Sequence, residues 1–457
     1  MTNTLTHKKE KLVPIKEGRV GIYSCGPTVY GDQHIGNMYA FMQWDLLTRT
    51  LRFLEYQTKW VMNITDVGHL TGDNEGNPDT GEDKMEKGAR REKMTVWEVA
   101  EKYISQFKDS IEKLGIAPDV LCRATDNISE QIDLIKKIES RGFTYQTKMG
   151  VLFDTSKFPN YADFAGLKLD KQKKQEDIVD DPEKKLPWDF FLWVTGRKQS
   201  MMWDSPWGKG YPGWHIECTA MSIKYLGERF DIHTGGMEHV GIHHTNEVAQ
   251  GFGAFGQVTA NYWLHNGWLM AEGGAKFSKS LGNIVTVQDL IKKNYDPITL
   301  RYLFLNSHYH KGMNFSYGAL DGAQTALNKL RKLMGDWKED KSREVLSPEK
   351  DTKINEYREK FTQALNDDLN IPQALAVAWE LAKSNIPSTD KYDLMTNFDE
   401  VLGLKLTQLS NSQLPISNEV EKLINDRNKF RAEGKYEEAD AIRQKLQKLG
   451  YSVQDKN

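Results

Sequence analysis

The segment SCGPTVYGDQHIGN, residues 24–37, sets the fold that we expect for this chain. It follows an apolar run, residues 20–23, which is typical of a first buried strand. The turn formers Gly26-Pro27 come next, and Gly36 precedes a helical pattern over residues 38–51. A strand that turns through glycine into a helix directs free backbone N–H groups and the helix dipole toward one point. A polyphosphate can bind there.

A second apolar run, residues 58–64, ends in Thr65-Asp66. Further strands are expected at residues 230–233 and 260–264, and helices at residues 97–114 and 243–251. Strands that alternate with helices indicate a parallel, doubly wound sheet of the α/β, Rossmann-like class. Ligands of such sheets bind where the strands end, so Cys25 and Thr65-Asp66 are expected on the binding edge.

Composition and charge exclude several classes of protein. The net charge of −3 gives no overall attraction to nucleic acid, so any RNA contact needs a local basic surface. Three widely spaced cysteines favour a reducing compartment over a disulfide framework. No apolar run approaches the roughly 18 residues of a membrane span, and residues 1–18 lack the apolar core of a signal peptide. We expect a cytoplasmic protein without membrane contact, and a monomer.

Three domains are expected along the chain. Residues 1–300 form the α/β domain with an insertion at about 115–200, in which the sheet pattern resumes at Pro187. The periodicity is wholly helical over residues 301–406, and residues 416–457 form a small helical domain after a polar linker. Its hairpin, residues 420–449, carries Ile442, Leu446 and Leu449 on one face. The Gly/Asp-rich residues 72–82 lack the ligand spacing of an EF-hand, which favours a solvated loop over a calcium site.

Four dispersed side chains form a candidate zinc set, namely Cys25, Cys218, His243 and Glu247. His243 and Glu247 are four residues apart in a helical pattern, so they share one helix face. Spacing alone leaves open the alternative of core thiols and a surface His–Glu pair. His215, His239 and His244 also compete for the role. His244 is the weakest competitor, because it points about a quarter-turn away from the shared face.

A second set of residues is typical of phosphate binding. His34 and Asn37 open a helix, and Lys276, Ser278 and Lys279 follow a pair of glycines. An imidazole and an amide can donate hydrogen bonds to phosphate oxygens, and lysines can close over them. Such a site stabilises charge at phosphorus and supplies no nucleophile. Each motif alone is weak evidence, since Lys/Ser loops are usually plain surface. The absence of a GxxxxGK[ST] motif argues against the common NTPases.

Both sets lie in stretches that resemble one family. These are CGPTVY with HIGN, Asn63-Ile64-Thr65-Asp66, WDSPWGKGYPGWHIECTAMS, DIHTGG, HHTNEVAQ, KFSKSLGN and RYLFLNSHYHKGMNF. The chain resembles the class I aminoacyl-tRNA synthetases and, among them, the cysteinyl-tRNA synthetases, over nearly its whole length. The sequence departs from the family's pattern in several places: Asn37 stands where histidine is usual and Phe277 where methionine is usual, and residues 67–70, residues 237–242 and the tail after Tyr451 also differ.

The resemblance implies one zinc ion on Cys25, Cys218, His243 and Glu247. The ion would bind the substrate L-cysteine as a thiolate and so reject serine. The resemblance further implies that Thr65 and Trp214 line the amino-acid pocket, with His233 near the substrate. ATP, accompanied by Mg²⁺, would lie between two groups of residues, with His34, Asn37, Lys276 and Lys279 catalytic. These groups are Gly26, His34, Gly36 and Asn37 on one side and Lys276, Ser278 and Lys279 on the other.

The implied reaction is the formation of cysteinyl-adenylate and pyrophosphate, followed by transfer of the cysteinyl group to the 3′-terminal ribose of tRNA(Cys). One alternative is a cysteine–amino-sugar ligase of the mycothiol-synthesis type, and another is a non-catalytic RNA- or metal-binding paralogue. The helical region after Leu300 and the hairpin at residues 420–449 favour tRNA as the acceptor. Arg427, Lys429 and Arg431 are candidates for anticodon contact, although charged helix faces are usually only solvated.

Overall fold

The computed structural model describes the chain except for residues 68–82, 167–180, 278–281, 341–346, 409–417 and 449–457. Its centre is a five-stranded parallel sheet in the order β11-β10-β3-β4-β5. The strands are β3 (Arg19–Ser24), β4 (Gln57–Ile64), β5 (Val120–Arg123), β10 (Phe230–Gly236) and β11 (Ala260–Asn266). The doubly wound parallel sheet expected from the sequence is therefore confirmed.

The direction of winding reverses beside β3. From β3 the chain moves outward through β4 to β5, and it later returns to the other side of β3 through β10 and β11. Open α/β sheets bind their ligands at such a switch point, beyond the carboxyl ends of the strands. Cys25 follows β3 directly at this point, and Gly235 and Gly236 end β10 beside it.

Side chains alternate between the two faces of this sheet. Ile22 and Trp60 belong to a core that includes α1 (Ile35–Phe53) and α3 (Val96–Leu114). Tyr23 and Val61 belong to a second core on the opposite face. That core includes α4 (Ile128–Ser140), α5 (Trp214–Leu226) and α7 (Thr245–Phe255). Helices thus cover both faces, which is why the strands are near-continuous apolar runs.

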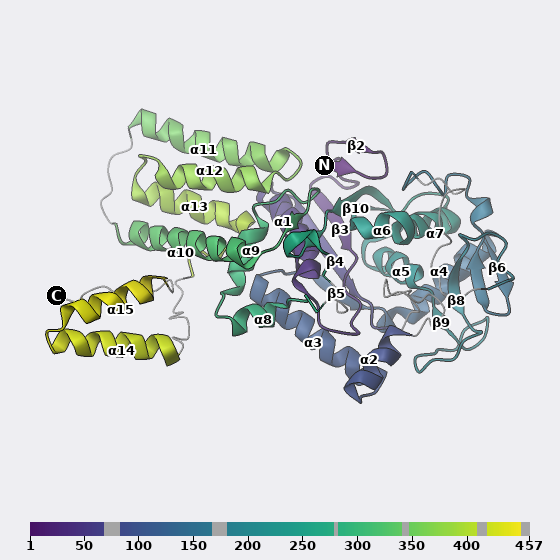
Figure 1. The fold of residues 1–457 in the computed structure, drawn as a ribbon. Coiled ribbons are helices and arrows are strands. Elements are labelled where there is room, and N and C mark those ends of the chain that lie inside the picture. Colours follow the sequence, from purple (N-terminus) through teal and green to yellow (C-terminus); the bar gives the residue numbers. More distant parts are fainter. Residues whose placement is uncertain (68–82, 167–180, 278–281, 341–346, 409–417, 449–457) are drawn as a thin grey trace.

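A separate antiparallel sheet, β6-β7-β8-β9, lies at the end of the molecule away from the helices of residues 317–402 (Figure 1). Its strands are β6 (Thr144–Thr147), β7 (Gly150–Phe153), β8 (Phe190–Val194) and β9 (Tyr211–Pro212). The sheet pattern expected to resume at Pro187 is β8, which pairs with β7 in this second sheet and not with the main sheet. Conversely β5, inside the insertion expected at about 115–200, pairs with β4 in the main sheet. An apolar run does not specify which sheet it joins, since long-range pairing decides that.

From Val287 onward the described elements are helices except for β13 (Met313–Asn314), so the expectation that residues 301–406 are wholly helical is wrong at this short strand. The helices are α8 (Val287–Lys292), α9 (Pro297–Phe304), α10 (Tyr317–Glu339), α11 (Pro348–Asn366), α12 (Ile371–Lys383) and α13 (Ser388–Leu402). The hairpin expected at the end of the chain is confirmed as α14 (Asn418–Ala432) packed on α15 (Tyr436–Lys448). Leu446 is buried in it, whereas Leu449 lies outside the described residues. None of the described helices is both long and apolar enough to cross a membrane.

Short elements complete the description. They are β1 (Thr2–Asn3), β2 (Lys8–Lys9), β12 (Leu269–Met270), β13 (Met313–Asn314), α2 (Lys84–Glu92) and α6 (Met237–His239). A π-helical turn, Val240–His244, joins α6 to α7, so the helix expected to begin at His243 begins at Thr245. The Gly/Asp-rich residues 72–82 lie outside the described part of the chain, so the expected loop remains a prediction.

Candidate active site and metal centre

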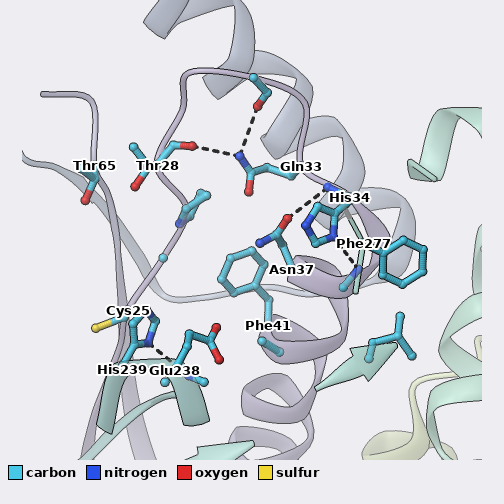
Figure 2. Close-up of a pocket in the computed structure, with 18 of the residues that line it drawn as sticks. Cys25, Thr28, Gln33, His34, Asn37, Phe41, Thr65, Glu238, His239 and Phe277 are labelled. Carbon is cyan, nitrogen blue, oxygen red and sulfur yellow. Dashed lines mark hydrogen bonds between the residues drawn. The ribbon is translucent and has the colours of Figure 1, made fainter. Parts of the chain in front are cut away.

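A cavity of about 550 Å³ lies at the switch point of the parallel sheet. Its wall includes the segment after β3, the first turn of α1, the end of β10 and residues 266–270 after β11. Figure 2 shows His34, Asn37 and Phe277 at one end of the cavity and Cys25 at the other. The site therefore has two ends, one rich in hydrogen-bond donors and one containing sulfur.

The turn after β3 is held against the end of β4. Gly26 N donates to Asn63 Oδ1 at 2.8 Å, and Thr65 N donates to Pro27 O at 2.9 Å. A Cβ atom on Gly26 would lie 1.7 Å from the backbone oxygen of Asn63, so only glycine fits there. This close approach places Cys25 beside Thr65 on the binding edge.

Asp66 does not share this edge, contrary to expectation. Its buried carboxylate accepts hydrogen bonds from Arg123 Nε at 2.7 Å and from Thr125 N at 2.9 Å. These bonds connect the end of β4 to the segment after β5. Asp66 therefore has a structural role and lies outside the cavity wall.

The first turn of α1 is capped by two side chains that also line the cavity. His34 Nδ1 accepts from Gly36 N at 3.0 Å, and Asn37 Oδ1 accepts from His34 N at 3.1 Å. The Phe277 ring stacks on the His34 ring, with centroids 5.6 Å apart. The sequence-predicted Gly36 also lines the cavity, close to the His34 ring.

Lys276 reaches the same end of the cavity from the other side. Its Nζ lies 5.2 Å from the centroid of the Trp268 ring, and Trp268 Nε1 donates to Glu238 Oε2 at 2.8 Å. All three side chains line the cavity. Ser278 and Lys279 lie outside the described residues, so their expected place opposite His34 remains a prediction.

The four predicted metal ligands converge at the other end. Their ligand atoms all lie within 4.8 Å of one another, and all four side chains are buried. Cys25 Sγ lies 3.8 Å from Cys218 Sγ and 3.8 Å from Glu247 Oε1, while His243 Nε2 lies 3.1 Å from Glu247 Oε1. Two sulfurs, one nitrogen and one oxygen this close together form a four-donor set of the types that bind zinc.

A second group of four shares two of these ligands. Cys25, His233, His244 and Glu247 also bring their ligand atoms within 4.8 Å of one another. His244 Nε2 lies 3.3 Å from Cys25 Sγ. The expectation that His244 is the weakest competitor is therefore wrong. It assumed the 100° step of an α-helix, whereas His243 and His244 end a π-helical turn, in which that step does not apply.

Two further histidines contact the ring nitrogens of His243 and His244 that face away from Glu247 and Cys25. His215 Nδ1 and His243 Nδ1 lie 3.0 Å apart, and His244 Nδ1 lies 2.6 Å from His265 Nε2. Each contact orients a ring whose other nitrogen faces Glu247 or Cys25. His239 belongs to neither ligand group, and its Nδ1 accepts from Gly236 N at 3.2 Å.

Burial controls the protonation of this cluster. It raises the pKa of the Cys25 thiol and of the Glu247 carboxyl well above their ordinary values. The hydrogen bond from Cys25 lowers the pKa of the Cys218 thiol. Burial also lowers the pKa of His233 and His244 well below the ordinary value, so these rings are neutral at pH 7. A dication would compensate the ionised acids and would bind in exchange for protons.

Of the three residues expected near the substrate amino acid, two line the cavity and one does not. Thr65 and Trp214 line the cavity, and the Trp214 ring lies 4.5 Å from the ring of His243. His233 is fully buried beneath Cys25 and stacks on Trp263, with centroids 4.2 Å apart, so it does not form part of the cavity wall. Its Nε2 lies 3.5 Å from Glu247 Oε1 and 3.6 Å from Cys25 Sγ, so it faces the metal ligands and not the cavity.

Sequence reasoning missed three residues that shape the site. Glu217 is fully buried and accepts from Thr65 Oγ1 at 3.0 Å, while Asn63 Nδ2 donates to the same hydroxyl oxygen at 3.1 Å. The ring of Trp268, which is half exposed, lies under the ammonium group of Lys276 in a cation–π contact. The one available signal was Glu217, a carboxylate directly before Cys218 in a helix whose other charged residue is Lys224 in its last turn.

Family models match most of this chain. Residues 11–325 match the tRNA synthetases class I (C) catalytic domain, residues 360–385 the DALR domain, and residues 415–457 the cysteinyl-tRNA ligase anticodon binding domain. The chain belongs to the cysteine–tRNA ligase family. The family expected from the motifs is thereby confirmed.

Full-length relatives agree with this assignment. The cysteine–tRNA ligase of Treponema denticola is 42% identical over 481 residues, covering 99% of this chain and 97% of that protein. The cysteine–tRNA ligase 1 of Burkholderia lata is 41% identical, covering 99% and 94%. Mycobacterium tuberculosis methionyl-tRNA synthetase in complex with methionyl-adenylate shares the fold. Its TM-score is 0.58 at 14% identity, over 84% of this chain and 90% of that one.

Proposed function

We propose that this chain activates L-cysteine with ATP and transfers it to tRNA(Cys) as a cysteine–tRNA ligase. The observation that carries the proposal is the two-ended cavity. Two thiols, an imidazole and a carboxylate meet at one end, and the start of helix α1 with its capping residues His34 and Asn37 lies at the other. An amino acid held by its thiol at the first end can direct its carboxylate toward an α-phosphate at the second.

The ligand set Cys25, Cys218, His243 and Glu247 fits zinc. The Cys25–Cys218 separation of 3.8 Å is the edge of a tetrahedron with metal–sulfur bonds of about 2.3 Å. A bound zinc ion would supply a soft centre that prefers a substrate thiolate to the hydroxyl of serine. His215 supports this set, because an Nδ1–H on His243 can donate to His215 and leave Nε2 for the metal.

The residues at the other end bind the triphosphate in this proposal. His34 Nδ1 already accepts from Gly36, so the neutral ring carries its proton on Nε2 and can donate to a phosphate oxygen. Asn37 offers its amide N–H₂, and Lys276 offers a cation that must leave the Trp268 ring to reach the phosphates. Lys279, with Ser278, closes over the pyrophosphate, and Mg²⁺ accompanies ATP.

The helical domains serve tRNA. Residues 301–406 would contact the tRNA stem and residues 416–457 the anticodon, in a monomeric, cytoplasmic enzyme whose residues 1–300 are catalytic. The match of residues 415–457 to an anticodon binding domain favours this acceptor over an amino sugar. The non-catalytic alternative is disfavoured because the phosphate-binding candidates His34, Asn37 and Lys276 line the same cavity as three of the metal ligands.

The test is cysteine-dependent ATP–pyrophosphate exchange on the zinc-loaded protein, with serine as the control substrate, followed by charging of tRNA with a GCA anticodon. Exchange with cysteine alone and subsequent charging are expected. Exchange without charging would transfer the assignment to the amino-sugar ligase. Absence of exchange in the presence of zinc would contradict both enzyme assignments.

A further inference from the structure

Two arginines meet one aspartate where the catalytic sheet joins the helical domain. Asp45 Oδ2 receives Arg49 Nε at 2.6 Å and Arg301 Nη2 at 2.6 Å. Asp45 and Arg301 are buried, with 3% and 0% of their surface exposed. We call these three residues the guanidinium joint. None of them lines the cavity described above.

The joint gathers the ends of two helices from different parts of the chain. Arg301 donates to the last carbonyls of α13 and α3, through Nε to Leu402 O at 2.7 Å and Nη1 to Leu114 O at 3.2 Å. Arg49 bonds to the same two helix ends: its Nη1 donates to Glu400 O in α13 at 3.0 Å, and its Nη2 donates to Gly115 O directly after α3 at 2.9 Å. Helix C-termini present unpaired carbonyls and a partial negative charge, which suit two guanidinium groups.

The chain beyond α13 is built around the same joint. Gly403 has φ +65, and a Cβ atom on it would lie 2.7 Å from the Arg301 guanidinium. Asp399 accepts from Leu404 N at 2.6 Å and Leu406 N at 2.8 Å, which orients the segment that leaves α13. This segment leads toward residues 415–457, the part that matches an anticodon binding domain.

Stability alone does not explain so much buried charge. Burying ions is costly, and an apolar cluster of similar volume stabilises a fold at least as well. What directed bonds add is a defined angle between the parts that they join. Asp45 belongs to α1 and lies about 16 Å along the helix axis from His34. The joint therefore attaches the helical domain to the same rigid helix whose first turn lines the phosphate end of the cavity.

We propose that Asp45, Arg49 and Arg301 are positioning residues for the tRNA-dependent step, which hold α10–α13 at a defined angle on the catalytic sheet. A folded tRNA is a rigid ligand, so its 3′ end reaches the cavity only if the surfaces that bind its stem and anticodon keep a defined orientation. The inference rests on the proposed function, because it presumes tRNA as acceptor. Activation of cysteine, which needs no tRNA, is independent of the joint.

The test compares Arg49→Met with Arg52→Met. Arg49 is about three-quarters buried, and its loss leaves Asp45 paired with Arg301. Arg52 lies on the same helix but bonds to Asp119 and Thr58 and not to α13, so its variant is the matched control. In R49M we expect cysteine-dependent pyrophosphate exchange to stay within about twofold and kcat/KM for tRNA to fall about tenfold or more, mainly through KM. R52M changes neither by more than about twofold.

Arg301→Met is expected to have a larger effect in the same direction, but it also risks misfolding. Hydrogen–deuterium exchange on R49M therefore supplies a second measurement, with faster exchange expected in residues 399–406 and not in R52M. Parallel losses of activation and charging, or unchanged charging with unchanged hydrogen exchange, would overturn the role of the joint alone. A wild-type protein that activates cysteine but does not charge tRNA would overturn the proposed function, and this role with it.

Discussion

The side-chain oxygen of Asn37 accepts a hydrogen bond from the backbone N–H of His34, three residues earlier at the start of α1, at 3.1 Å. The amide oxygen of Asn37 thus caps the helix, and its N–H₂ group is left to donate hydrogen bonds into the cavity (Figure 2). In the proposed function, this cap leaves the amide N–H₂ of Asn37 to donate to a phosphate where the family's motif usually has histidine. The orientation of the amide is set by the helix itself.

Replacement of Asn37 by aspartate should separate capping from phosphate binding. N37D retains the acceptor for His34 N but exchanges a donor for a negative charge, so pyrophosphate exchange is expected to fall about 100-fold or more. The unfolding temperature should change by no more than about 2 °C, because the cap is kept. N37A, which loses both, is the control. Near wild-type exchange in N37D would show that this side chain does not meet the phosphates.

The two overlapping ligand groups predict different zinc contents. If zinc binds Cys25, Cys218, His243 and Glu247, then H243N should lose about 10- to 100-fold or more in zinc affinity, since a direct ligand is removed. H244N should keep stoichiometric zinc. Metal analysis after dialysis against a weak chelator measures both variants side by side. The reverse result would assign the metal to the group that contains His233 and His244.

Gly26 should tolerate no side chain. In G26A the new Cβ would overlap the backbone oxygen of Asn63, so the segment with Cys25 must move away from β4. A displacement of about 1 Å can cost about 100-fold in rate, which is the loss expected for pyrophosphate exchange. A Cβ atom added to Gly318 on α10 would meet no heavy atom within 4 Å apart from its chain neighbours and the backbone of its own helix, and the φ of Gly318 is not positive. G318A should therefore retain full exchange activity and gain up to about 1 kcal/mol in stability.

Cys122 predicts a pH dependence that is separate from the active site. Burial raises the pKa of its thiol from 9.0 to about 12, so roughly one thiol in 10⁴ is ionised at pH 8. Because the folded pKa is raised, the neutral thiol contributes stability that is fully present below pH 9 and is lost as the pH rises through about 12. Alkylation of Cys122 by iodoacetamide should be very slow at pH 8 and accelerate about tenfold per pH unit. Peptide mass spectrometry of native and denatured protein measures both rates, and equal rates would contradict the burial of this thiol.

Patterns of apolar residues predicted a strand correctly where both faces of the strand are covered. The runs that became β3, β4, β10 and β11 are apolar because helices cover both faces of a parallel sheet. The four-residue spacing of His243 and Glu247 correctly brought them together, 3.1 Å apart in the structure. The same reasoning failed for His244, since a π-helical turn is a local departure that hydrophobic periodicity does not report.

The amino-acid order alone was enough to predict four of the five strands of the central sheet, several of the helices, the two groups of chemically apt residues and the family to which they belong. Which distant residues meet was settled only by the folded chain. Cys25 and Cys218 are 193 positions apart, and Asp45 and Arg301 are 256 positions apart. Strand order and helix packing bring them together, because long-range pairing depends on how whole faces fit and not on any local pattern. The guanidinium joint is invisible in the sequence for that reason, although each of its residues is printed there.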